Sequence, residues 1–327
     1  MIKIGIIGSS SISEKFCLAV REQINEGHDI ELHANYSRRM STAQAFAAKF
    51  EIHTSYDNKV EMLKTVDLVY IATPNRMHYA DVKLALSNNT HVLVEKPMTT
   101  TTAQTSELFD LAQDRNLVLV EAIKTCSMNT YQHILLNSNL IGDTTSFRLN
   151  MMRAYEHFPT ADDPQKANVF RREMEGGVIN DLGSYALFPL IDCIYPQTDV
   201  THINFKPLIS NFGLDVDTEA IISVAADNHQ AHGLITLSMK NRDDSLSYIY
   251  GSSGYLTIDS ISQFNHVKYY DLEHNLILDV KRDNSHLMST ELLHTIELIK
   301  THQLQSNIHA HEKSLKVAAL IEQIHKA

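Results

Sequence analysis

The first 120 residues repeat one pattern, a short buried apolar run followed by a segment with apolar residues at helical spacing. Residues 2–7 form the first run, and Ile12, Phe16 and Val20 follow it on one helix face. Further runs occupy residues 30–36, 66–72, 92–94 and 117–120, with helical patterns around residues 43–50, 79–86 and 108–112. Because parallel strands need crossover helices, this alternation predicts a doubly wound parallel sheet.

The rhythm changes after residue 121. Strand-like runs then follow one another directly, several of them joined by Gly, Asn or Asp turns, at residues 146–152, 200–205, 220–225, 231–237, 246–250 and 255–258. A last helical pattern carries its apolar residues on one face, at Val317, Leu320, Ile321 and Ile324. We therefore expect one domain over residues 1–121 and an α/β domain with a mostly antiparallel open sheet over residues 122–327, its C-terminal helix packing back on the body.

Composition narrows the class of protein. The formal net charge of −11 argues against nucleic acid or an anionic membrane as the main partner. Cys17, Cys126 and Cys193 are isolated, which indicates reduced packing thiols, and no signal segment or membrane-length run occurs. We expect a cytoplasmic protein. His309 and His311 are two residues apart and do not share a helix face, so no metal site is expected.

The apolar run at residues 92–94 ends in Glu95, Lys96 and Pro97. Ligands of open α/β sheets bind at the carboxyl ends of the strands, so a lysine beside a carboxylate there indicates a reaction centre. Pro97 ends the strand and stiffens the turn. The alternative is a surface ion pair at a strand end.

The first apolar run ends at Gly8, where a phosphate-binding G-x-G-x-x-G pattern would begin. Serines occupy the second and third glycine positions, Ser10 and Ser13. The candidate pyrophosphate ligands are Gly8 and the helix N-terminal amides of Ser9, Ser10, Ser11 and Ile12. The alternative is a strand-to-helix turn capped by serine.

Two other strand ends supply further candidates. The second run ends in Tyr36, Ser37 and Arg38 rather than in the acid that usually binds the ribose 2′-hydroxyl of NAD, so Ser37 and Arg38 favour the 2′-phosphate of NADP over NAD. Arg38 and Arg39 could instead be a solvated helix start. The run at residues 66–72 is followed by further candidate cofactor ligands, Thr73, Pro74, Asn75 and His78. For His78, a capping or surface role is the alternative.

The segment EGGVINDLGSYALFPL carries the last cluster. Gly176 and Gly177 permit close backbone approach, and Asp181 and Tyr185 are four residues apart, so both can lie on one helical face. Alternatively, Asp181 is an N-cap and Tyr185 a core aromatic.

Together, the Gly8 loop, I-A-T-P-N at residues 71–75, E-K-P at residues 95–97 and G-G-x-x-x-D-x-G-x-Y at residues 176–185 resemble the Gfo/Idh/MocA oxidoreductases. Tyr185, where many members have histidine, is similar to the dihydrodiol and xylose dehydrogenase branch. The resemblance implies a Rossmann domain that binds NAD(P) and a second domain for substrate and oligomerisation. It also implies a sugar, polyol or related diol as substrate, and a homodimer or homotetramer.

The resemblance also implies roles for single residues. Lys96 would be the catalytic lysine, Asp181 would hold Lys96 or the substrate, and Tyr185 would relay a proton. Glu95 would lie near the nicotinamide ribose, and Pro97 would follow a cis peptide. A non-catalytic dinucleotide and sugar sensor is the alternative function, which the loss of two loop glycines favours.

The chain departs from the family in the segment EAIKTCSMN. Relatives often carry an arginine and a proline where this chain has Cys126 and Asn129, which implies an altered substrate pocket. Substrate specificity is expected to involve Arg153, Tyr155, Phe170 and Arg171.

Overall fold

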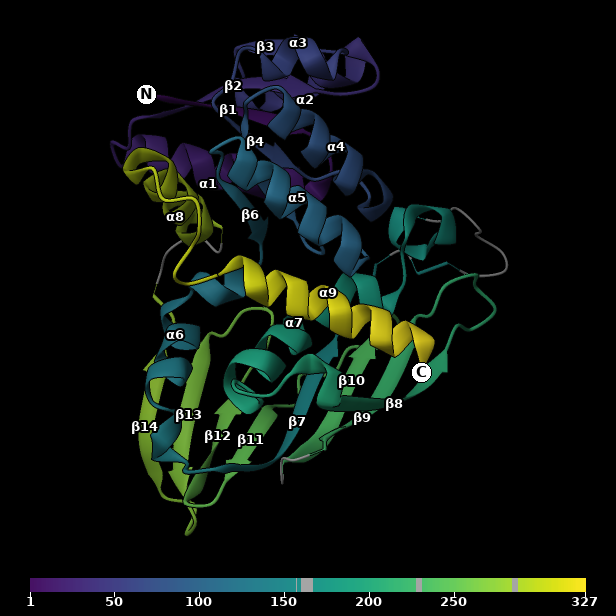
Figure 1. The fold of residues 1–327 in the computed structure, drawn as a ribbon, viewed down its shortest axis with the longest axis vertical. Helices are drawn as coiled ribbons and strands as arrows, with labels where there is room; N and C mark the ends of the chain where they lie inside the picture. The colour runs from purple at the N-terminus through teal and green to yellow at the C-terminus, as the bar shows by residue number, and fades with distance from the viewer. Residues whose placement is uncertain (157, 160–166, 228–230, 284–287) are drawn as a thin grey trace. The chain divides into compact units, whose positions relative to one another are not determined.

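The computed structural model describes residues 1–156, 158–159, 167–227, 231–283 and 288–327. The chain divides into two compact units, the first formed by Met1–Lys124 and Asn284–Ser314, the second by Thr125–Asp283 and Leu315–Ala327. A segment near the C-terminus, which the sequence pattern assigns to the second domain, thus groups with the first unit. Its helix α8 (Ser289–Thr301) packs against α1 (Ser11–Asn25), which explains this grouping (Figure 1).

The first unit contains a six-stranded parallel sheet in the order β3-β2-β1-β4-β5-β6, which confirms the predicted doubly wound sheet. Its strands are β1 (Ile2–Ile7), β2 (Ile30–Tyr36), β3 (Thr54–Tyr56), β4 (Leu68–Ile71), β5 (His91–Glu95) and β6 (Leu119–Ala122). The strand order reverses between β1 and β4, the position where such sheets bind ligands. Strand β3 was not predicted, because three residues are too short to show a period.

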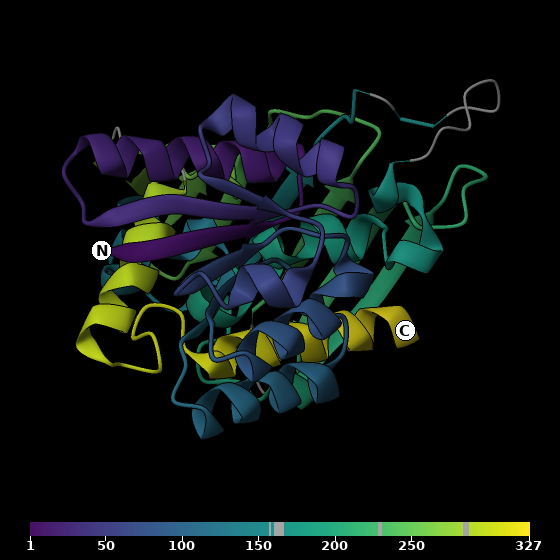
Figure 2. The same ribbon diagram turned by 90° about the horizontal axis from the view of Figure 1, so that it is seen from above.

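Helices cover both faces of this sheet. Besides α1 and α8 they are α2 (Met40–Phe50), α3 (Lys59–Leu63), α4 (Asn75–Ser87) and α5 (Thr102–Asp114). Figure 2 shows α1 on one side of the strands and α4 with α5 on the other. Phe16 of α1 stacks on Tyr70 of β4 with 3.8 Å between ring centroids, and Leu292 and Ile296 of α8 belong to the same core.

The second unit contains an eight-stranded sheet in the order β14-β13-β12-β11-β7-β10-β9-β8. Its strands are β7 (Thr144–Met152), β8 (Ile203–Ser210), β9 (Glu219–Ala226), β10 (His232–Ser238), β11 (Ser247–Gly251), β12 (Gly254–Ile258), β13 (His266–Asp271) and β14 (Leu276–Lys281). Among the described strands of this sheet, only the pair β7 and β10 is parallel, so the predicted mostly antiparallel sheet is confirmed.

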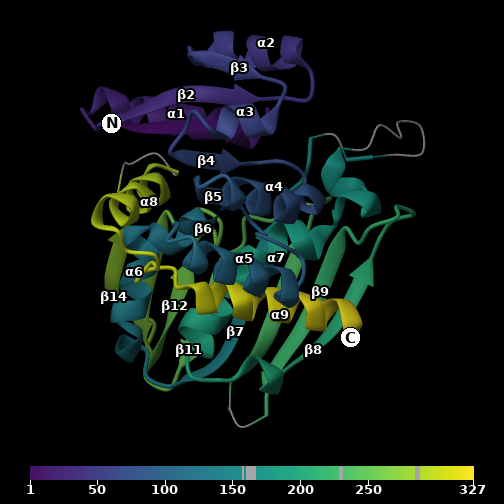
Figure 3. The same cartoon turned by 45° about the horizontal axis from the view of Figure 1, so that its top comes forward.

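One face of this sheet is covered by helices, and Figure 3 shows α6 and α7 lying over it. The helices are α6 (Asn129–Leu136), α7 (Val178–Pro189), α9 (His311–Lys326) and the short helices Lys124–Ser127, Ser138–Leu140, Asn168–Phe170, Arg172–Met174, Leu190–Ile194 and Val200–His202. The apolar stripe predicted for the last helix is buried as expected. None of the helices in the described ranges is long and apolar enough to cross a membrane.

Candidate functional site

The turn after β1 depends on Gly8. Its φ of +115° lies in a region that glycine adopts freely and other residues rarely do, and a Cβ there would lie 2.6 Å from the carbonyl oxygen of Ala72. The turn therefore meets the end of β4 closely, and it leads directly into the N-terminus of α1. A helix N-terminus with free amides directly after such a turn is the arrangement that binds the pyrophosphate of a dinucleotide in sheets of this kind.

Serine also caps α1, so the alternative of a strand-to-helix turn capped by serine describes part of this loop. The Oγ of Ser10 accepts a hydrogen bond from the amide of Ser13 at 3.4 Å. Ser13 is not among the predicted pyrophosphate ligands. The cap and the anion site therefore use different amides, and one does not exclude the other.

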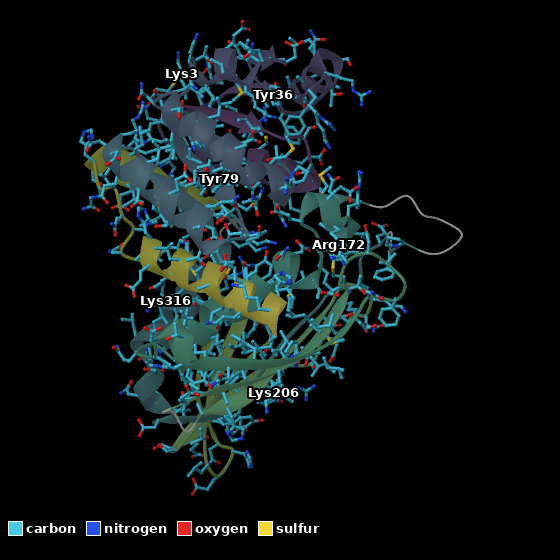
Figure 4. All side chains as sticks on the ribbon, turned by 45° about the vertical axis from the view of Figure 1, so that its right-hand side comes forward. Lys3, Tyr36, Tyr79, Arg172, Lys206 and Lys316 are labelled. Carbon is cyan, nitrogen blue, oxygen red and sulfur yellow. The ribbon has the colours of Figure 1, made fainter. Side chains whose placement is uncertain are left out.

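The end of β2 is tied to this loop. Ser37 is buried and its Oγ donates to the Oγ of Ser9 at 3.3 Å. Arg38 and Arg39 are exposed, and Arg39 occupies the N-cap position of α2, as a solvated helix start would require. Tyr36, labelled in Figure 4, has the ammonium of Lys59 5.1 Å from its ring centroid.

The loop after β4 is linked to the turn after β5 through His78. The Nδ1 atom of His78 lies 2.9 Å from the carbonyl oxygen of Pro97, and its Nε2 atom lies 2.8 Å from that of Thr73. The imidazole is 1% exposed, so the surface alternative is wrong. Both ring nitrogens of His78 thus contact backbone carbonyls, so this side chain holds the loop after β4 against the turn after β5. A contact of His78 with a cofactor stays a prediction.

The Glu95–Lys96–Pro97 turn is anchored to both neighbouring strands. Glu95 accepts a 2.5 Å hydrogen bond from the phenol of Tyr70 on β4, and the amide of Met98 donates to Glu121 of β6 at 3.0 Å. The Lys96–Pro97 peptide is cis, as the resemblance implied. Glu95 therefore contacts a buried phenol, which the alternative of a simple surface ion pair does not explain.

Two ionisable groups near this turn, the buried Glu291 and the half-buried Lys124, are not predicted from the sequence. Glu291 is buried in the first turn of α8, and burial, reinforced by the carboxylate of Glu95, raises its pKa well above the usual range. Burial likewise lowers the pKa of Lys124, against the opposing attraction of Glu291 and Glu95. No sequence signal identifies this cluster, because its members come from distant segments.

In the second unit, Gly176 and Gly177 set the start of α7. A Cβ at Gly176 would lie 2.4 Å from the carbonyl oxygen of Val169, and Gly177 has a φ of +108°. Gly177 is the N-cap residue, so the alternative that Asp181 caps the helix is wrong. Asp181 lies in the first turn, where the helix dipole favours a carboxylate, and Tyr185 follows one turn later; both are half-buried.

Asp181 accepts a hydrogen bond from the phenol of Tyr155. The ring of Tyr155 meets Phe170 edge to face, and the guanidinium of Arg153 lies 5.2 Å from its centroid. Tyr155 is expected from the sequence only as a specificity residue, because no local pattern connects it with Asp181.

The structure thus brings the candidate residues together in two groups. The first unit gathers the ends of β1, β2, β4 and β5, with Gly8, Ser9, Ser37, Thr73, His78, Glu95, Lys96 and Pro97. The second unit holds Asp181, Tyr185 and Tyr155. In the described part of the chain, no group of three or more His, Cys, Asp or Glu residues could hold a metal ion.

Residues 2–122 match the family model of the Gfo/Idh/MocA proteins, described as an oxidoreductase family with an NAD-binding Rossmann fold. Residues 2–122 thus form an NAD-binding domain of the Gfo/Idh/MocA type. The family resemblance and the prediction of an NAD(P)-dependent oxidoreductase are therefore confirmed.

Two curated relatives match the chain over almost its full length. The scyllo-inositol 2-dehydrogenase (NADP(+)) of Bacillus subtilis is 29% identical over 335 residues, covering 100% of this chain and 97% of the relative. The human trans-1,2-dihydrobenzene-1,2-diol dehydrogenase is 24% identical, covering 99% and 96%. The crystal structure of a 3-ketoreductase from Actinomadura kijaniata in complex with NADP and TDP-benzene shares the fold, with a TM-score of 0.81, 20% identity and coverage of 99% and 97%.

Proposed function

We propose that this enzyme moves a hydride between a nicotinamide cofactor and a hydroxyl-bearing carbon of a sugar, polyol or related diol. The observation that carries the proposal is the anchored Glu95–Lys96–Pro97 turn, which ends β5 beside the strand-order reversal of a dinucleotide-binding sheet. Relatives named as inositol and dihydrodiol dehydrogenases support the substrate class.

NADP is the proposed cofactor, with NAD as the alternative. Ser37 and Arg38 stand at the end of β2 without an acidic neighbour, and an arginine binds a 2′-phosphate through charge-assisted hydrogen bonds. The Bacillus subtilis relative is itself named as NADP-dependent. Gly8, the amides of Ser9 to Ile12 and the loop after β4 would hold the remaining parts of the dinucleotide. When bound, the nicotinamide supplies the hydride chemistry.

The protein contributes charge stabilisation and proton transfer. As the substrate hydroxyl loses its proton, the ammonium of Lys96 stabilises the developing alkoxide. By the motif resemblance, Tyr185 relays the proton and Asp181 orients the substrate. The joint action of these three residues rests on the motif resemblance. A phenol is a weak acid near neutral pH, so a nearby cation is needed to make Tyr185 effective.

A turnover assay tests the proposal. The protein is mixed with oxidised NADP or NAD and a series of inositols and polyols, or with reduced NADPH or NADH and a series of ketoses, and the absorbance of the reduced nicotinamide is followed. We expect turnover with at least one substrate, faster with NADP. Absence of turnover across the series, combined with strong stabilisation by dinucleotide and sugar, would instead identify the sensor.

We also propose that the protein works in the cytoplasm and self-associates as a homodimer or homotetramer. Three free cysteines suit a reducing compartment. The face of the second-unit sheet opposite its helices exposes apolar side chains on the neighbouring strands β8, β9 and β10, at Leu208, Ile221 and Leu234, and on β11 at Tyr250. A second copy of the chain would cover this face.

A further inference from the structure

The hydrogen bond between Tyr155 and Asp181 joins two separate segments of the second unit. Asp181 comes from the first turn of α7, whereas Tyr155 lies three residues beyond the end of β7. The Tyr155 segment is itself held to the chain after β10. The amide of Arg153 donates to the carbonyl of Ser238 at 2.8 Å, and the amide of Tyr155 donates to that of Met239 at 3.0 Å.

Packing also restricts the phenol ring. Phe170 is fully buried and meets the Tyr155 ring edge to face, with centroids 5.6 Å apart and an interplanar angle of 80°. On the same ring, the guanidinium of Arg153 is in cation–π range. Backbone and ring are therefore both fixed, so the hydroxyl is a preorganised donor to Asp181.

We propose that Tyr155 is a positioning residue that acts through Asp181. Its hydroxyl donates to Oδ2, which sets the rotation of the carboxylate and with it the direction of Oδ1. A hydrogen bond to a carboxylate is a strong one, so it holds this rotation firmly. This inference rests on the proposed function, because Asp181 must take part in the reaction for its orientation to matter.

A double-mutant cycle separates action through Asp181 from an independent effect. The variants are Tyr155→Phe, Asp181→Asn and the pair, each assayed for kcat and KM with saturating cofactor. We expect Tyr155→Phe to lower kcat about tenfold, the range of one hydrogen bond to a charged group, with little change in the KM of the cofactor. In the Asp181→Asn background the same substitution should change kcat by less than about twofold.

Tyr195→Phe is the matched control. The Tyr195 hydroxyl donates to the carbonyl of Ala231 at 2.7 Å in the same unit, so this variant also loses one phenol hydrogen bond. It should lower the melting temperature without changing kcat. If Tyr155→Phe does not fold, Phe170→Leu, which loosens the ring but keeps the hydroxyl, should lower kcat only when Asp181 is present.

Two results would overturn the inference. One is an unchanged kcat in Tyr155→Phe, and the other is an equal loss of kcat from Tyr155→Phe with and without Asp181. The failure of the proposed function gives a different pattern. If the protein is a sensor, the wild type itself shows no turnover across the substrate series. If it is an enzyme with another catalytic set, Asp181→Asn and Lys96→Ala both keep full turnover on a verified substrate.

Discussion

Lys96 tests the proposed chemistry at the scale of one residue. Removing the ammonium in Lys96→Ala should lower kcat by about two to four powers of ten, the usual contribution of acid–base catalysis, while cofactor binding is largely retained. Steady-state kinetics and a cofactor titration measure the two effects. Lys83→Ala is the control, because Lys83 forms an exposed pair with Glu107 that contributes little. Unchanged turnover in Lys96→Ala would remove Lys96 from the mechanism.

Gly8 tests the cofactor loop at the same scale. In Gly8→Ala the new Cβ meets the carbonyl oxygen of Ala72 at 2.6 Å, and backbone atoms cannot easily move away. We expect cofactor affinity to fall by at least tenfold and the melting temperature to drop. In the control Gly27→Ala, φ is also positive at +90°, but no heavy atom lies within 4 Å of the new Cβ. Gly27→Ala should lower the free energy of unfolding by about 1–3 kcal/mol through backbone strain and leave the cofactor affinity unchanged. Equal effects of the two substitutions on affinity would refute a close-approach role for Gly8.

At the scale of elements, α8 brings a buried acid into the first unit. The pKa of Glu291 is raised well above its ordinary value of 4.5, first by burial and then by Glu95, so the folded state binds a proton that the unfolded state releases. This acid therefore stabilises the fold at low pH, and its contribution is lost as pH rises above 4.5 toward the raised pKa. Its Oε2 has no hydrogen-bond partner among the described residues.

Glu291→Gln should weaken this pH dependence. We expect the melting temperature of the variant to decline less than that of the wild type between about pH 4.5 and pH 8, because the amide does not ionise. Thermal unfolding across this range measures the difference. The control is Glu107→Gln on α5. Hydrogen bonds from Lys83 and Tyr79 lower the pKa of Glu107, so this carboxylate stabilises the fold above its ordinary pKa, which is the opposite pH dependence to that of Glu291. A steeper decline in Glu291→Gln than in the wild type would contradict the assignment.

At the scale of the whole molecule, the open sheet face makes assembly testable. Leu234→Glu would put a charge in the middle of the exposed apolar face and should shift the protein toward monomers, as light scattering at several concentrations would show. Leu272→Glu is the control, because Leu272 is also an exposed leucine, 64% against 42% for Leu234, but follows β13 outside the face. A wild-type monomer, or an oligomer unaffected by Leu234→Glu, would exclude this face as the interface.

The parts of the fold that the sequence predicted are those with a strong local period. The predicted strands before residue 121 are buried on both faces and appear as apolar runs, whereas the helices, including α9, are buried on one face and show a helical period. The sequence pattern predicts both kinds of element. Strands β13 and β14 were missed. β14 is an edge strand whose side chains are largely exposed, so no buried alternation marks it. The helix α8 was not assigned to the first unit, because its packing partners lie near the other end of the chain.

The same distinction holds for the site. The sequence by itself determined the fold class, the family and the candidate residues at strand ends, because turn glycines, a strand-ending E-K-P and a helical D-x-x-x-Y spacing are local constraints. Only the tertiary structure decided that Tyr70 and Glu121 anchor the Lys96 turn, that His78 links two loops and that Tyr155 holds Asp181. These are contacts between segments distant in the chain, and the packing that forms them leaves no periodic signal in the sequence.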